Sequence, residues 1–220
     1  MTRIVALVPM RHSSERVPGK NYRDLGGKPL YAHVIGTLLA SGVVDQVVVD
    51  TDSPTVTEGM AVAFPEVLVL ERPEHLRAGE VPMNDVILHD ISQVEADLYL
   101  QTHTTNPLLR PETVKAAVEA FTGSPEHDSL FTVTPLHTRL WTEHGQPMNH
   151  DPKVLLRTQD LPPVMEENSN MYLFSGELIR STGSRIGTNP MLYPVPAEEA
   201  WDIDEEIDWV VVESLLGRCS

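Results

Sequence analysis

The sequence predicts an α/β fold, because short β-branched segments alternate with longer amphipathic segments along the first half of the chain. The 220 residues include 41% hydrophobic ones, enough for a buried core, and no repeat, linker or low-complexity segment interrupts the pattern. We therefore expect one main globular unit with a three-layer αβα, Rossmann-like arrangement and a mostly parallel sheet.

The first half is expected to alternate strands with helices. Its first strand is an apolar run, and its first helix carries apolar residues at helical spacing before Gly42, a residue typical of the position after a helix. The strands are expected at 4–9, 44–52, 66–73 and 96–101, and the helices at 28–42, 56–64, 83–93 and 111–121.

The second half has a weaker pattern. From 134 to 163 the regular spacing gives way to a stretch rich in His, Pro and polar residues. After this stretch we expect a strand at 170–175, a short helix, a strand at 191–196 and a final helix within 204–216.

The composition limits the possible ligands. The 32 Asp and Glu outnumber the 16 Lys and Arg, and the net charge of -16 argues against binding to nucleic acid or to an anionic membrane. The apolar stretch at 4–10 is too short for a signal peptide or a membrane span, so we expect a cytoplasmic protein. A single cysteine, Cys219, and nine histidines without an i, i+4 pair or an HExxH motif argue against a disulfide and a zinc site.

A basic loop follows the first strand. The sequence RHSSERVPGKN at 11–21 lies at the carboxyl edge of the expected sheet, where parallel sheets bind their ligands. Backbone amides and cations in such a loop can hold a phosphate chain. The loop is neither G-x-G-x-x-G nor a P-loop, because Ser14 stands where a P-loop needs Gly and Asn21 where it needs Ser or Thr.

The loop resembles the N-terminal signature of the acylneuraminate cytidylyltransferase (CMP-N-acetylneuraminic acid synthetase) family, and further short motifs resemble that family in the same order. These motifs are Gly27-Lys28-Pro29-Leu30, Thr51-Asp52, Arg72-Pro73-Glu74, Leu100-Gln101, Asn106-Pro107-Leu108-Leu109-Arg110, Gln159-Asp160-Leu161-Pro162, Asn168 with Met171-Tyr172, Arg185-Ile186-Gly187 and Asp202-Ile203-Asp204. The resemblance implies a fold of the nucleotide-diphospho-sugar transferase type. It also implies a homodimer with a smaller dimerisation and sugar-side extension at 134–196, a segment that contains scattered apolar residues such as Trp141 and Met148.

The family resemblance implies a reaction in which CTP and an α-keto sugar acid give a CMP-sugar and pyrophosphate, through attack of the anomeric hydroxyl on the α-phosphate. Arg11 and Lys20 would neutralise the triphosphate and stabilise the transition state. Ser14 and the loop amides would hydrogen-bond the phosphates, Asn21 would fix the nucleotide, and Arg72 would approach the cytosine. The alternative is a solvated loop without a ligand.

Two acids near the C-terminus are the expected metal ligands. Asp202 and Asp204 are two positions apart, so an extended backbone would place both carboxylates on one face, where they can meet one Mg²⁺ ion. The resemblance assigns the family's metal ligands to these residues, and Asp204 is also expected to activate the sugar hydroxyl. The alternative for Asp202 is a capping box with Glu205 at the start of the last helix.

The expected sugar contacts follow from the resemblance and are less distinctive. Gln101 matches the family's sugar-contacting Gln, and Arg157 is suited to pair the sugar carboxylate. Gln159 lies in a matching segment, and Asn168 either binds substrate or forms a turn. The alternatives are an ordinary surface amide for Gln101 and an exposed, unengaged side chain for Arg157.

Three functions compete. The first is a cytidylyltransferase for a nonulosonic acid of the sialic, legionaminic or pseudaminic type. The second is CMP-Kdo synthetase, whose basic loop resembles 16–20, although that branch places an acid after Leu-Gln and the segment 101–107 holds none. The third is a noncatalytic nucleotide-sugar-binding protein. Glu15, which stands where relatives often carry Lys, and the longer segment 102–107 are departures from the family.

Overall fold

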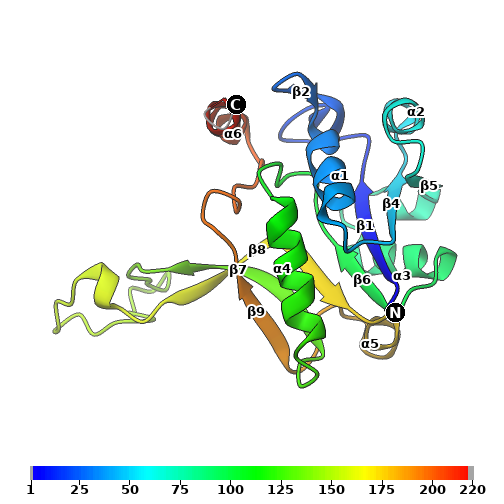
Figure 1. The fold of residues 1–220 in the computed structure, drawn as a ribbon. Helices are drawn as coiled ribbons and strands as arrows, with labels where there is room; N and C mark the ends of the chain where they lie inside the picture. Colours follow the sequence, from blue (N-terminus) through cyan, green and yellow to red (C-terminus); the bar gives the residue numbers. More distant parts are fainter. Residues whose placement is uncertain (1, 218–220) are drawn as a thin grey trace.

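The computed structural model describes residues 2–217, so Cys219 lies outside the described residues (Figure 1). Its centre is a seven-stranded sheet with the strand order β5-β4-β1-β6-β8-β7-β9. The strands are β1 (Ile4–Met10), β4 (Gln46–Thr51), β5 (Leu68–Glu71), β6 (Leu98–Gln101), β7 (Ser129–Leu136), β8 (Val164–Phe174) and β9 (Pro190–Pro194). β1, β4, β5 and β6 pair in parallel, and β8 runs antiparallel to β6 and β7. The expected Rossmann-like, mostly parallel sheet is therefore confirmed.

Helices cover both faces of this sheet, as the layered arrangement requires (Figure 1). Alternate residues of β1 point to opposite layers: Ala6 and Val8 join the core under α1, α2 and α4, whereas Val5 and Leu7 join the core under α3 and α5. Because β1 is buried on both faces, its sequence is a continuous apolar run. The helices are α1 (Leu30–Ser41), α2 (Pro54–Ala63), α3 (Met83–Gln93), α4 (Pro111–Thr122), α5 (Gly176–Thr182) and α6 (Glu206–Leu216).

Local signals explain where the early helices begin and end. α1 ends at Ser41 and is followed, as the sequence predicted, by Gly42, whose φ of 69° is left-handed. α2 begins after Ser53, whose hydroxyl accepts a hydrogen bond of 3.3 Å from the backbone N–H of Val56, and Pro54 occupies the first helical turn. β4 thus passes into α2 through a short loop at the carboxyl edge of the sheet.

A strand that the sequence did not predict leads into the region where the pattern fades. β7 spans Ser129–Leu136, and β8 begins at Val164, before the strand expected at 170–175. The outer halves of both strands pair only with each other and are partly exposed, so they lack the apolar signal of a buried strand. The intervening residues 137–163 form an arm that projects from the sheet (Figure 1).

The last helix packs on the loop that follows β1. α6 contributes Trp209 and Val212 to a small apolar cluster with Val17, Leu25 and the buried Ile203. Because Ile203 anchors extended backbone in this cluster, α6 begins later than the capping alternative requires. Its N-cap is Glu205, so the proposed capping box of Asp202 with Glu205 is wrong.

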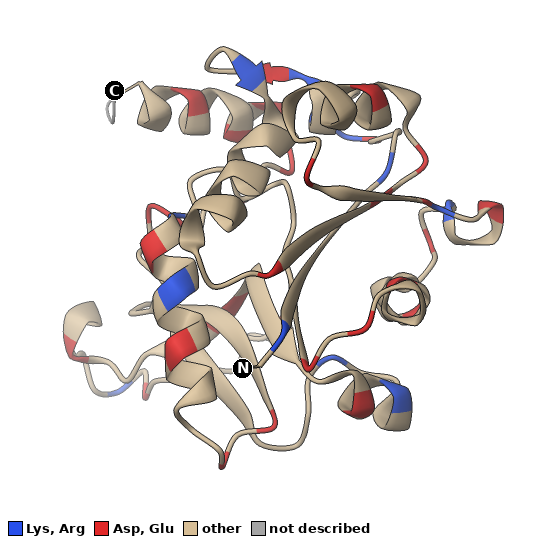
Figure 2. Cartoon of the chain, turned by 45° about the vertical axis from the view of Figure 1, so that its right-hand side comes forward, with Lys and Arg blue, Asp and Glu red and all other residues tan. Residues whose placement is uncertain are grey.

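Charge is distributed around this framework. Acidic residues lie on helices and loops on several sides of the sheet (Figure 2), consistent with the net charge of -16. Among the described residues, no helix combines the length and the apolar character needed to cross a bilayer.

Candidate active site

A cavity of about 480 Å³ lies at the carboxyl edge of the sheet, beside the ends of β1 and β6. Three segments form most of its wall: the loop after β1, the region 72–83 and the loop after β6. All five predicted nucleotide-binding residues line it, namely Arg11, Ser14, Lys20, Asn21 and Arg72. The structure thus brings together residues that are up to 61 positions apart in the chain, from 11 to 72. Their role toward a nucleotide stays a prediction.

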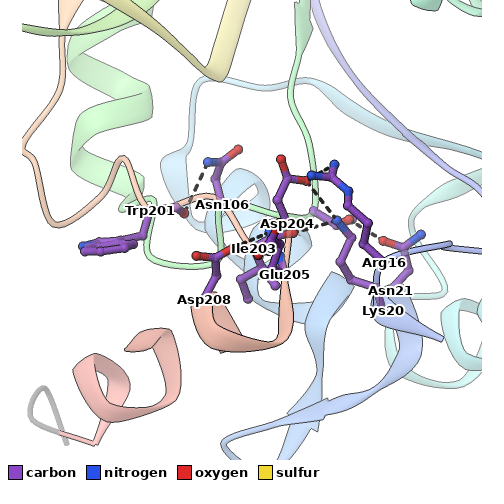
Figure 3. Close-up of polar contacts among 10 residues, drawn as sticks. Arg16, Lys20, Asn21, Asn106, Trp201, Ile203, Asp204, Glu205 and Asp208 are labelled. Carbon is purple, nitrogen blue, oxygen red and sulfur yellow. Dashed lines mark hydrogen bonds and ion pairs between the residues drawn. The ribbon is translucent and has the colours of Figure 1, made fainter. Parts of the chain in front are cut away.

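Lys20 is held at the cavity by the segment that carries the two candidate metal ligands (Figure 3). Its Nζ donates a hydrogen bond of 2.6 Å to the backbone oxygen of Ile203 and lies 3.6 Å from Asp204 Oδ1. Arg16 Nη2 lies 2.8 Å from the same Asp204 oxygen. Burial lowers the pKa of Lys20, and the nearby Asp204 and Asp202 carboxylates oppose this shift. Lys20 is therefore a fixed cation with a mostly buried side chain.

Asn21 joins the two loops of the cavity wall. Its Nδ2 donates a hydrogen bond of 2.7 Å to the backbone oxygen of Arg11, and its Oδ1 accepts one of 2.6 Å from the hydroxyl of Thr104. The turn before it needs Gly19, whose φ is 67° and where a Cβ atom would lie 2.9 Å from the Tyr22 ring. Asn21 thus fixes the shape of the site through both ends of its amide.

Arg72 lies at the inner wall, above two buried acids that the sequence did not single out. Its Nε donates to Asp50 Oδ1, and its Nη2 lies 3.4 Å from the backbone oxygen of Asp50. Behind this pair lies Asp90 of α3, and ligand atoms of Asp50, His89 and Asp90 all lie within 4.8 Å of one another. Burial, and secondly the Asp50 carboxylate, raise the pKa of Asp90 to about 9. Arg72 is therefore anchored by a carboxylate that stands beside a protonated acid.

The donor set of Asp202 and Asp204 fits a hard divalent cation. Asp202 Oδ1 is buried and has no hydrogen-bond partner among the described residues, and burial raises the pKa of this carboxyl group. Asp204, two positions further, keeps 44% of its side chain exposed. An unsatisfied buried carboxylate oxygen beside a second carboxylate is a pair of ligands that Mg²⁺ prefers.

The predicted sugar-binding residues do not line this cavity within one chain. Gln101 is fully buried. Its Oε1 accepts a hydrogen bond from Arg185, and its Nε2 donates one of 3.1 Å to the backbone oxygen of Thr102. Asn168 donates a hydrogen bond of 3.0 Å to the hydroxyl of Thr134 within the sheet. The side chains that form the wall in front of Gln101 belong to the next loop, and the first of them is His103.

Arg157 and Gln159 lie on the projecting arm. Arg157 has 73% of its side chain exposed and forms two hydrogen bonds of 2.7 and 3.0 Å with Asp160. Gln159 is exposed in the short 3-10 helix η3 (Thr158–Asp160). Neither residue lines the cavity within one chain, so the sugar-binding roles of both stay predictions.

Several residues of the site were not among the predicted site residues. Arg16 and His103 line the cavity, and Glu15, the departure from the family pattern, lines it too. His103 follows β6 by two positions, so its place at the carboxyl end of a parallel strand was a usable signal. Asp50 also lies at the carboxyl end of a parallel strand, β4, but no sequence signal pairs it with Asp90, because only the packing of α3 brings the two acids together.

The chain matches the model of the cytidylyltransferase family over residues 5–205. It belongs to this family. Among curated relatives, the CMP-N,N'-diacetyllegionaminic acid synthase of Legionella pneumophila is 32% identical over 97% of this chain and 96% of its own. N-acylneuraminate cytidylyltransferase A of Danio rerio is 30% identical over 98% of this chain, which spans about half (51%) of that relative.

A solved structure supports the fold of this family member. The structure of CMP:2-keto-3-deoxy-manno-octonic acid synthetase complexed with CTP superimposes with a TM-score of 0.70, 18% sequence identity and full coverage of both chains. A 4-diphosphocytidyl-2C-methyl-D-erythritol synthase gives a TM-score of 0.71 at 19% identity over 98% of this chain and 100% of its own. At these identities the likeness concerns the fold alone.

Proposed function

We propose that the protein transfers CMP from CTP to the anomeric hydroxyl of a nonulosonic acid and releases pyrophosphate. The observation that carries this proposal is a cavity lined by several cations, one of which, Lys20, lies beside the acid Asp204. Arg11 and Lys20 line the cavity, and Lys20 lies 3.6 Å from Asp204. Two relatives that each cover nearly all of this chain, named for legionaminic and N-acylneuraminic acids, support this substrate class.

The cations supply the main chemical contribution. During attack on the α-phosphorus, negative charge grows on the phosphoryl oxygens and on the leaving pyrophosphate. Lys20 neutralises this charge from a fixed position, so little reorganisation is needed at the transition state, and Arg11 adds a second positive charge. Ser14 and the backbone amides of the loop position the phosphate chain. Gly79 leaves room for Arg11, since a Cβ atom there would lie 3.0 Å from Arg11 Nη1.

Asp202 and Asp204 would hold a Mg²⁺ ion, which, when bound, would add positive charge beside the phosphoryl oxygens. Arg16 and Lys20 already contact Asp204, so its carboxylate is oriented before a ligand arrives. We propose that Asp204 orients the attacking hydroxyl and accepts its proton. Asp202 supplies the second oxygen donor from its buried side.

We also propose a homodimer formed through the extension at 134–196. Its exposed apolar side chains include Leu155, 89% exposed, Met148, 63% exposed, and Trp141, 50% exposed. Large apolar side chains are seldom exposed together on the surface of a monomeric protein. Placement of the enzyme in the cytoplasm is part of the same proposal.

CMP-Kdo synthetase is the second candidate. A 3-deoxy-manno-octulosonate cytidylyltransferase of Escherichia coli is 30% identical over 67% of this chain, a smaller coverage than the first relative has. The segment 101–107 contains no acid, which favours the nonulosonic acids. A noncatalytic nucleotide-sugar-binding protein is the third candidate.

The test is pyrophosphate release from CTP and Mg²⁺ with N,N'-diacetyllegionaminic acid, N-acetylneuraminic acid or 3-deoxy-manno-octulosonate. We expect turnover with a nonulosonic acid and a loss of about 100-fold in Lys20→Ala. Lys115→Ala, an exposed residue of α4, should retain full activity. Turnover with 3-deoxy-manno-octulosonate alone would favour the second candidate. Silence with every acceptor, together with measurable CTP binding, would favour the noncatalytic protein.

A further inference from the structure

Three polar side chains form a row that ends at the cavity wall: Arg185, Gln101 and His103. We propose that His103 recognises the acceptor sugar acid by donating a hydrogen bond from Nδ1, and that Gln101 and Arg185 are positioning residues that fix this tautomer. The inference rests on the proposed function and deepens it by naming a residue that selects the acceptor.

The orientation of the Gln101 amide follows from Arg185. A guanidinium group only donates hydrogen bonds, and Arg185 Nη1 donates to Gln101 Oε1. The amide nitrogen of Gln101 therefore faces the other way, where it lies 3.1 Å from His103 Nε2. Because an amide NH₂ is a donor, His103 Nε2 must be the acceptor, and the ring proton must lie on Nδ1.

Arg185 is itself held in place, so the direction of the row is fixed. Its guanidinium stacks on the Tyr172 ring at 3.6 Å from the centroid. The Tyr172 hydroxyl in turn donates to Glu167 and lies 3.2 Å from the hydroxyl of Ser169. These contacts come from β8, the strand that pairs with β6, and they keep Arg185 aimed at Gln101.

His103 stays neutral over the physiological range. Burial, then the positive charges of Arg185 and Lys20, lower its pKa to about 4, and Asp204 opposes this only in part. Its Nδ1 makes no hydrogen bond with any residue that the structure describes, and His103 lines the cavity. The ring therefore presents one N–H donor, without a charge, to whatever occupies the cavity.

The place of His103 favours the acceptor over the nucleotide. β6 lies between β1, whose loop carries the predicted triphosphate ligands, and β8, which carries the side chains that support Arg185. His103 therefore lines the cavity from the loop after β6 and, through Gln101, contacts the side chains that β8 supports. A neutral donor suits a carboxylate or hydroxyl oxygen of a sugar acid, since the cations of the β1 loop already serve the phosphates.

Nuclear magnetic resonance of the ¹⁵N-labelled protein tests the tautomer without turnover. The His103 signals are assigned by their loss in His103→Asn, and we expect a protonated Nδ1 and an unprotonated Nε2 between pH 6 and 8. Gln101→Glu replaces the donor by a carboxylate, so we expect the proton to move to Nε2 and the pKa of His103 to rise. A wild-type ring protonated at Nε2, or at both nitrogens near pH 7, would overturn the proposal.

Steady-state kinetics test the contact with the acceptor. In His103→Ala we expect the KM for N,N'-diacetyllegionaminic acid, or for the acceptor found active, to rise about 10- to 100-fold, with the KM for CTP unchanged. His103→Asn, whose amide can place a donor near the Nδ1 position, should recover part of the loss. His127 precedes the amino end of β7, whereas the cavity lies at the carboxyl ends of β1 and β6. His127→Asn is therefore the matched control.

The outcomes separate the two proposals. A raised KM for CTP with an unchanged KM for the acceptor would contradict the role of His103 while leaving the cytidylyltransferase function intact. If the wild-type protein released no pyrophosphate with any acceptor, the proposed function would be refuted. The role of His103 toward a sugar acid would fall with it, although the tautomer measurement would still decide how Gln101 orients the ring.

Discussion

Replacing Asp90 by Asn should remove a large part of the pH dependence of the free energy of unfolding. Asp50 and Asp90 are each 1% exposed, and Arg72 is 2% exposed. With both acids ionised, this buried group would carry one uncompensated negative charge, and a single proton makes it neutral. A divalent ion would instead leave a positive charge beside Arg72. The folded state is therefore expected to hold a proton on the acid pair.

The sign and the size follow from the pKa of Asp90, which is raised from 3.8 to about 9. Between these values the folded protein keeps a proton that the unfolded chain has lost. The stabilisation is fully present below the unfolded pKa and is lost as the pH rises through about 9. The slope is about 1.4 kcal/mol per pH unit, so the wild type should lose roughly 2 to 3 kcal/mol from this source between pH 6 and 8.

Urea unfolding followed by circular dichroism at pH 6, 7 and 8 measures this slope. Asp90→Asn keeps the size of the side chain and a donor toward Asp50, so we expect a much flatter dependence. Asp85→Asn, exposed on the same helix, should keep the wild-type slope. Parallel curves for wild type and Asp90→Asn would refute the shared proton. Stabilisation of the wild type by Zn²⁺ that Asp90→Asn lacks would also refute it, in favour of a metal site.

Three further predictions concern the proposed reaction and assembly. Asp202→Asn and Asp204→Asn should both shift pyrophosphate release to higher Mg²⁺ concentrations, with the larger loss of turnover in Asp204→Asn, and superimposable Mg²⁺ curves would eliminate the metal role. Glu15→Lys, which reverses an exposed charge on the cavity wall, should lower the KM for CTP about 3- to 10-fold, and an unchanged KM would show that Glu15 points away from the triphosphate. Leu155→Asp should give a monomer by light scattering at micromolar concentration, whereas a monomeric wild type would contradict the dimer.

The layered core could be predicted because its signals are local. The apolar run of β1 and the helical spacing before Gly42 depend only on neighbouring residues, and both elements lie where they were expected. The helix expected at 83–93 has the bounds of α3. The strand β7 was missed because its outer half pairs only with β8 at a poorly buried part of the sheet and contains Pro135.

The candidate site could be predicted in part for the same reason. Residues after β1 reach the cavity because they share one loop, and the strand ends at the carboxyl edge are adjacent by topology. The Asp50–Asp90 pair could not be predicted, since its partners are 40 positions apart and come from a strand and a helix. Gln101 lies at the expected strand end, but its amide is held by Arg185, 84 positions later, a contact that the sequence does not indicate.

The distance between the basic loop and the two acids is set by apolar packing more than by the ion pairs that join them. Arg16 has 60% of its side chain exposed and Asp204 has 44%, and exposed pairs contribute little to stability. By contrast, Ile203 is fully buried beside Val17 of the loop and Trp209 of α6. Because this cluster holds both segments independently of charge, the ion pairs can open when a triphosphate competes for Arg16 and Lys20. The acids then remain in place beside the cavity, available to a cation.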